Sequence, residues 1–432
     1  MKTTKYFLMF LMGTSVLAQQ STLTLQKSLE LGLNSSKEIK LSKSALVSAK
    51  AKYGEMSSNL YPQLSVGLNY NHLSQVPIQF NMPLFPESAE PINAVFANAT
   101  IEQPLFMGFK LLSLKNAAEY GKEAVAIENS NVINEKALQI QISFWSFYKA
   151  EKIVEVLTEN IEALEKYLKD TEAFLQNGLA TKNDLLKLKV RVSEMHTKLI
   201  ETKNAFEVSR AVLNKNVGYS LEEKTKIAAP KLEEEFVDYN YEQILEEALE
   251  MRSELKSNNY QSLAAEEKID AANSTWYPQI AAFGSFNYFK VDGTNLLRDQ
   301  WTDFWMVGLS VNWDIWDWWK TSSIAEQAQQ QYNQTQLTNQ ILKENIEVEI
   351  YRNYLFLKSE KSKVEVSKLR IESAEENHRI IKDKYDSQMA TSTELIDADN
   401  EVLDAKTKLI TSYIDYKIAK VRLEKSIGRK IY

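Results

Sequence analysis

Residues 320–388 read KTSSIAEQAQQQYNQTQLTNQILKENIEVEIYRNYLFLKSEKSKVEVSKLRIESAEENHRIIKDKYDSQ, with neither glycine nor proline. Most of these residues favour a helix, and the apolar ones recur at helical spacing. One seam repeats at intervals of seven residues: Ile350, Leu357, Val364 and Ile371. At about 1.5 Å per residue, one helix over this stretch would be about 100 Å long, and this length exceeds the diameter of a globular core. The stretch therefore predicts a coiled coil, a helical repeat or a long helical tube.

The N-terminus has the pattern of a secretory signal peptide. Lys2 and Lys5 precede and border an apolar run over residues 6–12, and the small residue Ala18 follows. The run is too short to span a bilayer, so we expect residues 1–18 to be a cleaved signal peptide. The chain contains no cysteine, which excludes a disulfide framework and a lipid attached to an N-terminal cysteine.

Charge and hydropathy limit the classes of partner that the mature chain can have. Removing two lysines with the leader takes the formal net charge from −7 to about −9, which argues against nucleic acid. No later segment has the roughly 18 consecutive apolar residues of a transmembrane helix. Any contact of the mature chain with the hydrocarbon region of a membrane must therefore use β-strands.

The sequence contains two copies of one unit. Leu-Tyr-Pro-Gln-Leu at 60–64 recurs as Trp-Tyr-Pro-Gln-Ile at 276–280, and Gly218 has a counterpart in Gly428. Such internal similarity decides the architecture of a repeat protein. We place the copies at 19–218 and 241–432 and a polar, acidic linker at 219–240.

Each copy predicts two strands followed by a long helical hairpin. The expected strands are about 64–76 and 93–105 in the first copy, and about 278–290 and 302–314 in the second. The expected hairpins are 111–217 and 320–427. Proline does not interrupt any of these helices, which supports the boundaries. Shorter helices stacked end to end could pair along each long one.

The strands alternate apolar and polar residues. In the stretch 302–314 one side carries Trp305, Val307, Leu309, Val311 and Trp313. Segments of about ten alternating residues are typical of a membrane β-barrel, although a half-buried antiparallel sheet has the same period.

Tryptophan favours the membrane alternative. Seven of the eight tryptophans lie between residues 276 and 319, near both strand ends. Such clusters are typical of aromatic girdles at bilayer interfaces. The expected girdle includes Trp305, Trp313, Trp316 and Tyr70. Four strands cannot close a barrel, and open edges are not tolerated in lipid, so several chains must contribute strands.

These features together resemble the TolC family of outer-membrane efflux proteins. The resemblance rests on the leader, the duplicated unit, the two Tyr-Pro-Gln motifs and Gln-Pro-Leu-Phe-Met-Gly at 103–108. It implies a mostly α-helical homotrimer in which a twelve-stranded β-barrel continues as a long α-helical barrel from the outer membrane into the periplasm. It also implies an exit duct of a tripartite efflux pump or type I secretion system. Its partners would be outer-membrane lipid, a periplasmic adaptor (membrane fusion protein) and an inner-membrane pump.

The resemblance also assigns roles to the two helical tips, 178–185 and 388–395. Family members narrow the duct with acidic side chains, and Glu394 and Asp397 fall on those positions. In a trimer these would form carboxylate rings that favour cations. Thr181 with Asp184, and Thr391 with Glu394, also have the spacing of helix-capping boxes, so capping is the alternative role for these acids.

The family closes its tip with a tyrosine, an aspartate and an arginine. Tyr385 and Asp184 match the first two, whereas Ala390 stands in place of the arginine, so the lock is incomplete. Tyr385 could equally be a packing residue. Four residues at the tips, Gly178, Leu179, Met389 and Ala390, form the expected surface for adaptor docking.

No catalytic pattern is present. The chain has no cysteine and only three histidines, none at ligand spacing. We expect no enzyme activity, no metal and no cofactor. The alternative function is a periplasmic coiled-coil adaptor or scaffold without channel activity, which would explain the long hairpins but not the strands rich in aromatic residues.

Overall fold

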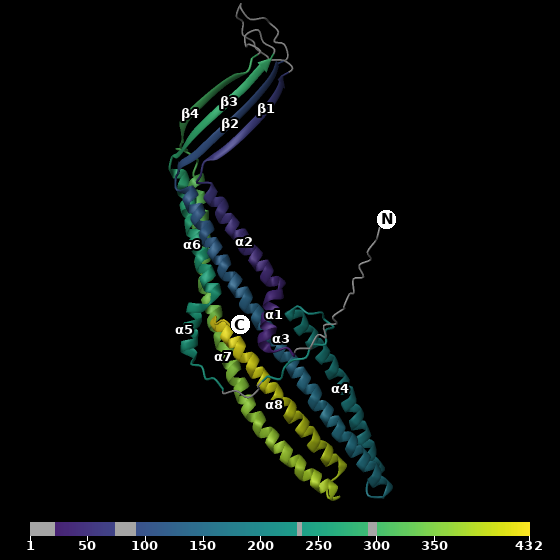
Figure 1. The fold of residues 1–432 in the computed structure, drawn as a ribbon. Helices are drawn as coiled ribbons and strands as arrows, with labels where there is room; N and C mark the ends of the chain where they lie inside the picture. The colour runs from purple at the N-terminus through teal and green to yellow at the C-terminus, as the bar shows by residue number, and fades with distance from the viewer. Residues whose placement is uncertain (1–21, 74–91, 231–235, 293–299) are drawn as a thin grey trace, which may run out of the picture.

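The computed structural model describes residues 22–73, 92–230, 236–292 and 300–432. The predicted signal peptide lies outside these residues. The molecule is elongated, with a small sheet at one end and the tips of two helical hairpins at the other (Figure 1). The two shortest α-helices, α1 and α5, lie beside the long helices near the middle of the molecule.

The sheet has four antiparallel strands in the order β1-β2-β3-β4. They are β1 (Gln63–Leu73), β2 (Ile92–Met107), β3 (Gln279–Asp292) and β4 (Thr302–Asn312). Their described ends lie within two residues of the expected ones, except that β1 is described only to Leu73 and the expected residues 74–76 lie outside the described part of the chain. The ladder between β3 and β4 ends at Gln279 and Asn312, so Trp313 lies just beyond the strand that the sequence predicts for it.

The pairing register puts the apolar rows of all four strands on one face. Leu64 lies opposite Ile101, Ile101 opposite Gly284, and Gly284 opposite Val307. Directly opposite residues of antiparallel strands share a face, and every second residue returns to it. The other face carries mainly small and polar residues: Ser65, Asn98, Thr100, Ser285, Asn287 and Ser310.

The helices of the first half precede and follow β1 and β2. They are α1 (Leu25–Ser35), α2 (Lys37–Ser58), α3 (Lys110–Gln176) and α4 (Lys182–Val217). Ser36 separates α1 from α2 because its extended backbone ends the first helix, while its side chain accepts a hydrogen bond from the Ile39 amide of the second.

The second half has the corresponding helices. They are α5 (Tyr241–Met251), α6 (Ser253–Asn273), the short 3-10 helix η1 (Ser274–Trp276), α7 (Lys320–Asp386) and α8 (Ser392–Ile427). Both α3 and α7 have 67 residues, and both α4 and α8 have 36. The start of α6 meets the end of α8, where Arg252 donates a hydrogen bond of 2.9 Å to the Ser426 carbonyl.

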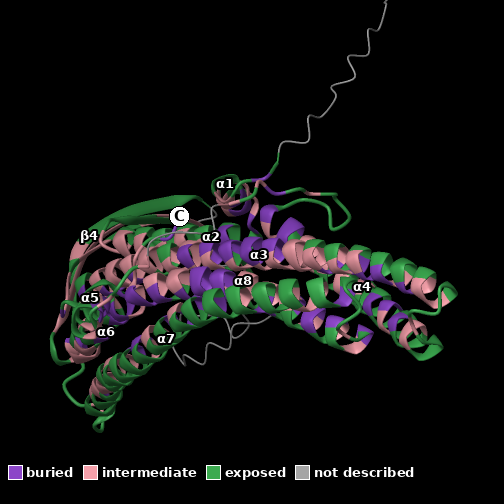
Figure 2. Cartoon of the chain, turned by 90° about the horizontal axis from the view of Figure 1, so that it is seen from below, coloured by how far each residue is buried: buried purple, intermediate pink, exposed green. Residues whose placement is uncertain are grey.

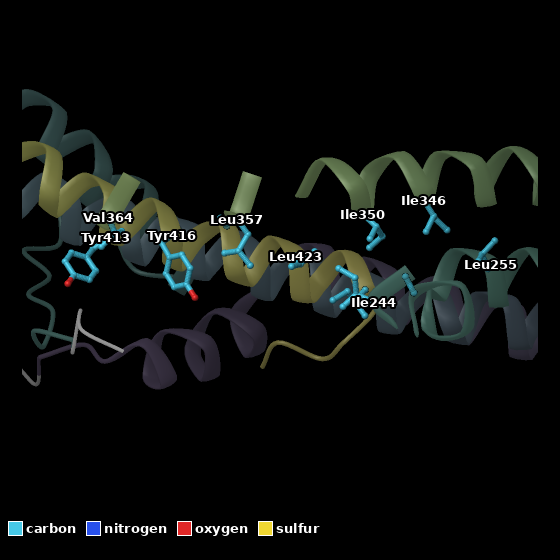
Figure 3. Close-up of a cluster of buried hydrophobic side chains, with 12 residues drawn as sticks. Ile244, Leu255, Ile346, Ile350, Leu357, Val364, Tyr413, Tyr416 and Leu423 are labelled. Carbon is cyan, nitrogen blue, oxygen red and sulfur yellow. The ribbon is translucent and has the colours of Figure 1, made fainter. Parts of the chain in front are cut away.

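Apolar side chains between the helices hold the molecule together. In one cluster, Ile346 and Ile350 of α7 meet Leu423 of α8, Ile244 of α5 and Leu255 of α6 (Figure 3). A second cluster joins α3, α4 and α8 to the segment before α1, and a third joins the hairpins near their tips. The structure confirms the predicted fold class of long helices with a small antiparallel sheet.

Candidate functional sites at the two ends of the chain

The first helical tip is a tight helix-ending turn. Gly178 has a left-handed backbone with φ of +73°, and its amide donates to the Leu175 carbonyl at 3.1 Å. The Leu179 amide donates to the Phe174 carbonyl at 2.8 Å. This pair of bonds satisfies carbonyls that the end of α3 would otherwise leave free. The Leu179 side chain remains 54% exposed at the end of the molecule.

The second tip repeats this geometry without glycine. Gln388 is left-handed with φ of +63°, and the Met389 amide donates to the Lys384 carbonyl at 2.7 Å. Met389 is 74% exposed, whereas Ala390 packs against the third apolar cluster. Of the four expected docking residues, therefore, Leu179 and Met389 offer apolar side chains to solvent and Ala390 is partly covered.

Both predicted capping boxes are formed. Thr181 accepts from the Asp184 amide at 3.2 Å, and the Thr181 amide donates to the Asp184 carboxylate at 3.1 Å. In α8, the Thr391 amide donates to Glu394 at 2.7 Å. The hydrogen bonds from Thr181 and Ser392 lower the pKa of Asp184, and those from Thr391 lower the pKa of Glu394. Both carboxylates are therefore ionised at neutral pH.

The two tips are bonded to each other. Ser392 donates a hydrogen bond of 2.7 Å from its hydroxyl to Asp184, and Lys187 donates one of 3.0 Å to the Thr393 hydroxyl. Sequence reasoning missed Ser392 and Lys187. Their partners are about 200 residues away, and no local pattern reports such a contact.

Tyr385 and Asp184 do not bond to each other within the chain. The Tyr385 hydroxyl is 2.8 Å from the Thr171 hydroxyl, and its ring lies 6.2 Å from that of Phe174. Burial raises the pKa of Tyr385. The packing contacts expected for Tyr385 as the alternative to a gate role are therefore present in the single chain. Asp397 is exposed, one turn beyond Glu394, and forms no hydrogen bond or ion pair with any residue that the structure describes.

At the opposite end, the apolar face of the sheet is open. Trp305, Val307 and Leu309 of β4 are each at least 68% exposed. On β1, Leu64, Val66 and Leu68 are each at least 72% exposed. Large apolar areas of this kind mark a surface that meets lipid or protein. Only β1 and β4 have an unpaired edge in this sheet.

Aromatic residues lie at both ends of the strands. Where β4 leads into α7, the Trp316 ring lies 5.6 Å from those of both Trp318 and Trp319, and Trp313 donates to the Trp276 carbonyl at 3.3 Å. At the other end Tyr288 stacks on Trp301 at 4.7 Å. Near that end of β1, Tyr70 donates a hydrogen bond of 2.9 Å to Asn93. This distribution is typical of the two interfaces of a bilayer.

None of the described helices is long and apolar enough to cross a membrane. The described histidine, aspartate and glutamate residues form no group of three or more that could hold a metal ion.

Known proteins share both the fold and the sequence pattern. Residues 244–429 match the family model described as outer membrane efflux protein. The outer membrane protein TolC of Vibrio cholerae is 18% identical over 86% of this chain and 83% of its own. The outer membrane protein VceC of Vibrio cholerae has a TM-score of 0.80 at 14% identity, over 94% of this chain and 97% of its own. The CmeC outer membrane channel of Campylobacter jejuni has a TM-score of 0.83 at 15% identity, over 94% of this chain and 85% of its own.

The fold is that of the outer-membrane efflux channels, with a small β part and long helices. Residues 244–429 of this chain match the outer membrane efflux protein family, which confirms the resemblance read from its motifs. The chain is an outer-membrane exit duct of an efflux system and extends into the periplasm. The alternative of a periplasmic adaptor without channel activity is not favoured.

Proposed function

We propose that three copies of this chain form the duct, each made of the repeats 19–218 and 241–432 with 219–240 as linker. The observation that carries the proposal is a four-stranded sheet with two open edges and an exposed apolar face. Open edges are not tolerated in hydrocarbon, and three copies would close the sheet into a barrel of twelve strands. Trp305, Trp313, Trp316 and Tyr70 would then lie in its aromatic girdles.

The long helices support the same assembly. One side of α7 exposes Ile341, Val348 and Leu355 at intervals of seven residues. At the other edge of the chain, α4 exposes Ile200, Val208 and Val212. Two different apolar edges make a head-to-tail contact, and such contacts close into a ring when the rotation between copies is suitable. Repeated three times, this contact would give a helical tube that continues the barrel.

We propose that the tips close this tube at its periplasmic end. Glu394 and Asp397 are exposed on successive turns at the start of α8, and in a trimer they would form two rings of three carboxylates. Asp184 and Tyr385 would hold the closed tip: Asp184 ties α4 to α8 through Ser392, and Tyr385 ties α7 to α3 through Thr171. Acidic rings favour cations and repel anions.

Replacing Glu394 by Gln together with Asp397 by Asn tests the gate. Gln at the third position of a helix retains the capping geometry, so the variant removes charge without removing the cap. In planar bilayers we expect a weaker preference for cations and weaker block by divalent cations, with a difference that shrinks at high salt. The control variant Glu372→Gln with Glu375→Gln removes two exposed charges from α7 away from the tip. Unchanged ion selectivity in the tip variant would leave these acids with capping alone.

We further propose that an adaptor hairpin docks at the tips and that an inner-membrane pump supplies the energy. The space beside Gly178 is open, and Leu179 and Met389 are exposed next to it and to the partly covered Ala390, so the tips offer two apolar anchors. A tip-to-tip contact buries a small area, so it would be weak without the pump. The related proteins are channels, and we propose that this chain has no enzymatic activity and needs no cofactor.

A further inference from the structure

A groove of about 390 Å³ lies at mid-length, between α3, α7 and the end of α8. Arg352 of α7 and Arg422 and Lys425 of α8 line it, together with the apolar side chains of Leu138 and Phe356. Its volume falls within the range of small-molecule sites, which combine apolar walls with a few charged groups. A basic groove is unexpected in a chain with a formal net charge of −7.

The acids of this groove are already neutralised. Glu349 accepts a hydrogen bond of 2.8 Å from Arg252, and Glu135 lies 2.9 Å from the Lys425 ammonium. Arg352 and Arg422, in contrast, form no ion pair or side-chain hydrogen bond with any other described residue, and both are exposed. Two guanidinium groups therefore remain available in one groove.

The groove opens on the side of α8 that the linker does not cover. The linker reaches α8 through Tyr239, whose hydroxyl donates to Glu424 at 3.1 Å, and through the Val237 amide, which donates to Tyr416. Arg422 and Glu424 are two residues apart, so they point about 200° apart around the helix. If the linker and the short helices surround the outside of the tube, the groove faces the duct.

We infer that this groove binds organic anions with an apolar body, such as aromatic sulfonates or carboxylates. A guanidinium matches an oxyanion with two parallel hydrogen bonds, and two of them can share one sulfonate. Phe356 and Leu138 supply the apolar contact. The biological role of this site rests on the proposed function. In a trimeric duct, three such sites would lie at one level and would retain anionic cargo in transit.

The test uses the purified full-length protein in nanodiscs, with naphthalene-2-sulfonate as the probe and neutral 2-naphthol as its uncharged match. We expect the sulfonate to bind more tightly than the naphthol by about tenfold, and its affinity to fall as salt is added. Arg352→Gln with Arg422→Gln should weaken sulfonate binding about tenfold and leave naphthol binding unchanged. Arg352→Lys with Arg422→Lys should recover part of the affinity, because it keeps charge but loses the two-pronged geometry.

The matched control is Arg370→Gln with Arg379→Gln, which removes two arginines from α7 that pair with acids elsewhere on the helices. It should bind the sulfonate like the native protein. Equal binding by the native protein and the Arg352/Arg422 variant, equal binding of sulfonate and naphthol, or no sulfonate binding at millimolar concentration would each overturn the site.

Mass in detergent and single-channel conductance separate this inference from the proposed duct. Sulfonate binding that depends on the two arginines in a protein that neither trimerises nor conducts would retain the site and reject the duct. A conducting trimer without such binding would retain the duct and reject the site.

Discussion

The two long helices α3 and α7 have the same length and corresponding places in the chain, but they are buried very differently. Eighteen residues of α3 are buried, against nine of α7. Leu112 is the one large apolar residue of α3 that is clearly exposed, whereas α7 exposes ten, from Ile324 to Ile380. Figure 2 shows the contrast as a largely green α7 beside a pink and purple α3.

Position in the layer of helices explains this difference. Helix α3 lies between neighbours, with α2, α4, α6 and α8 all packed against it, whereas α7 has α6, α8 and the short α5. Trp145 and Leu355 occupy corresponding positions 210 residues apart, yet Trp145 is 6% exposed and Leu355 is 44% exposed. The same apolar pattern therefore forms a core on α3, where other helices surround it. On α7, at the edge of the layer, it leaves an apolar surface open for an interface.

The largest expected effect comes from opening the α3 core. Trp145→Ala should lower the free energy of unfolding by about 3–5 kcal/mol, because it leaves a cavity beside Phe144 and Tyr148. Leu355→Ala at the corresponding position should cost less than half as much. Denaturant unfolding followed by circular dichroism measures both, and equal losses would contradict the comparison.

A charge on the open face of α7 should affect assembly more than folding. Val348→Asp would put a carboxylate into the proposed contact with a second copy, where it would lose water without gaining a partner. We expect at least a tenfold fall in the trimer fraction, about 1.4 kcal/mol, with unchanged helix content. Lys343→Asp, on the other side of α7, is the control for native mass spectrometry. Normal trimers from Val348→Asp would place the interface elsewhere.

At the two tips, we expect one substitution to lower local stability and another to raise it, both by smaller amounts than the changes above. Gly178→Ala should destabilise the first tip by about 1 kcal/mol, because a side chain is disfavoured at positive φ even though no atom lies near the new Cβ. Gln388→Gly should stabilise the second tip by a similar or smaller amount, because it removes that strain. Hydrogen exchange of the amides at 175–180 and 385–390 reports each tip. If both substitutions changed the amide protection in the same direction, the proposed effect of the left-handed backbone at the two tips would be wrong.

The smallest effect concerns pH. Hydrogen bonds from the caps hold the pKa values of Asp184 and Glu394 below their ordinary range. A carboxylate with a lowered folded-state pKa stabilises the fold above its ordinary pKa, and this contribution is lost as pH falls through the folded value. We therefore expect the amide protection factors at both tips to fall slightly between pH 5 and pH 3. Asp184→Asn should remove this pH dependence at the first tip alone.

Much of this molecule follows from local sequence. The absence of glycine and proline over 320–388 predicts the length of α7, and alternation predicts which strand residues share a face. The spacing of Thr181 from Asp184, and of Thr391 from Glu394, predicts the caps that the structure contains. Each of these properties depends on residues within one or two turns or strand steps, so a single sequence suffices to find them.

The tertiary structure alone decided which of these elements meet. Only the fold brings Ser392 to Asp184, or Tyr385 to Thr171, and only the fold shows that β2 pairs with β3 and so joins the two halves. The groove with Arg352 and Arg422 likewise exists because α7 and the end of α8 lie together beside α3. Sequence periodicity says which side of a helix is apolar or charged. The choice of neighbour depends on packing between residues some 70 to 300 positions apart, and no local pattern contains it.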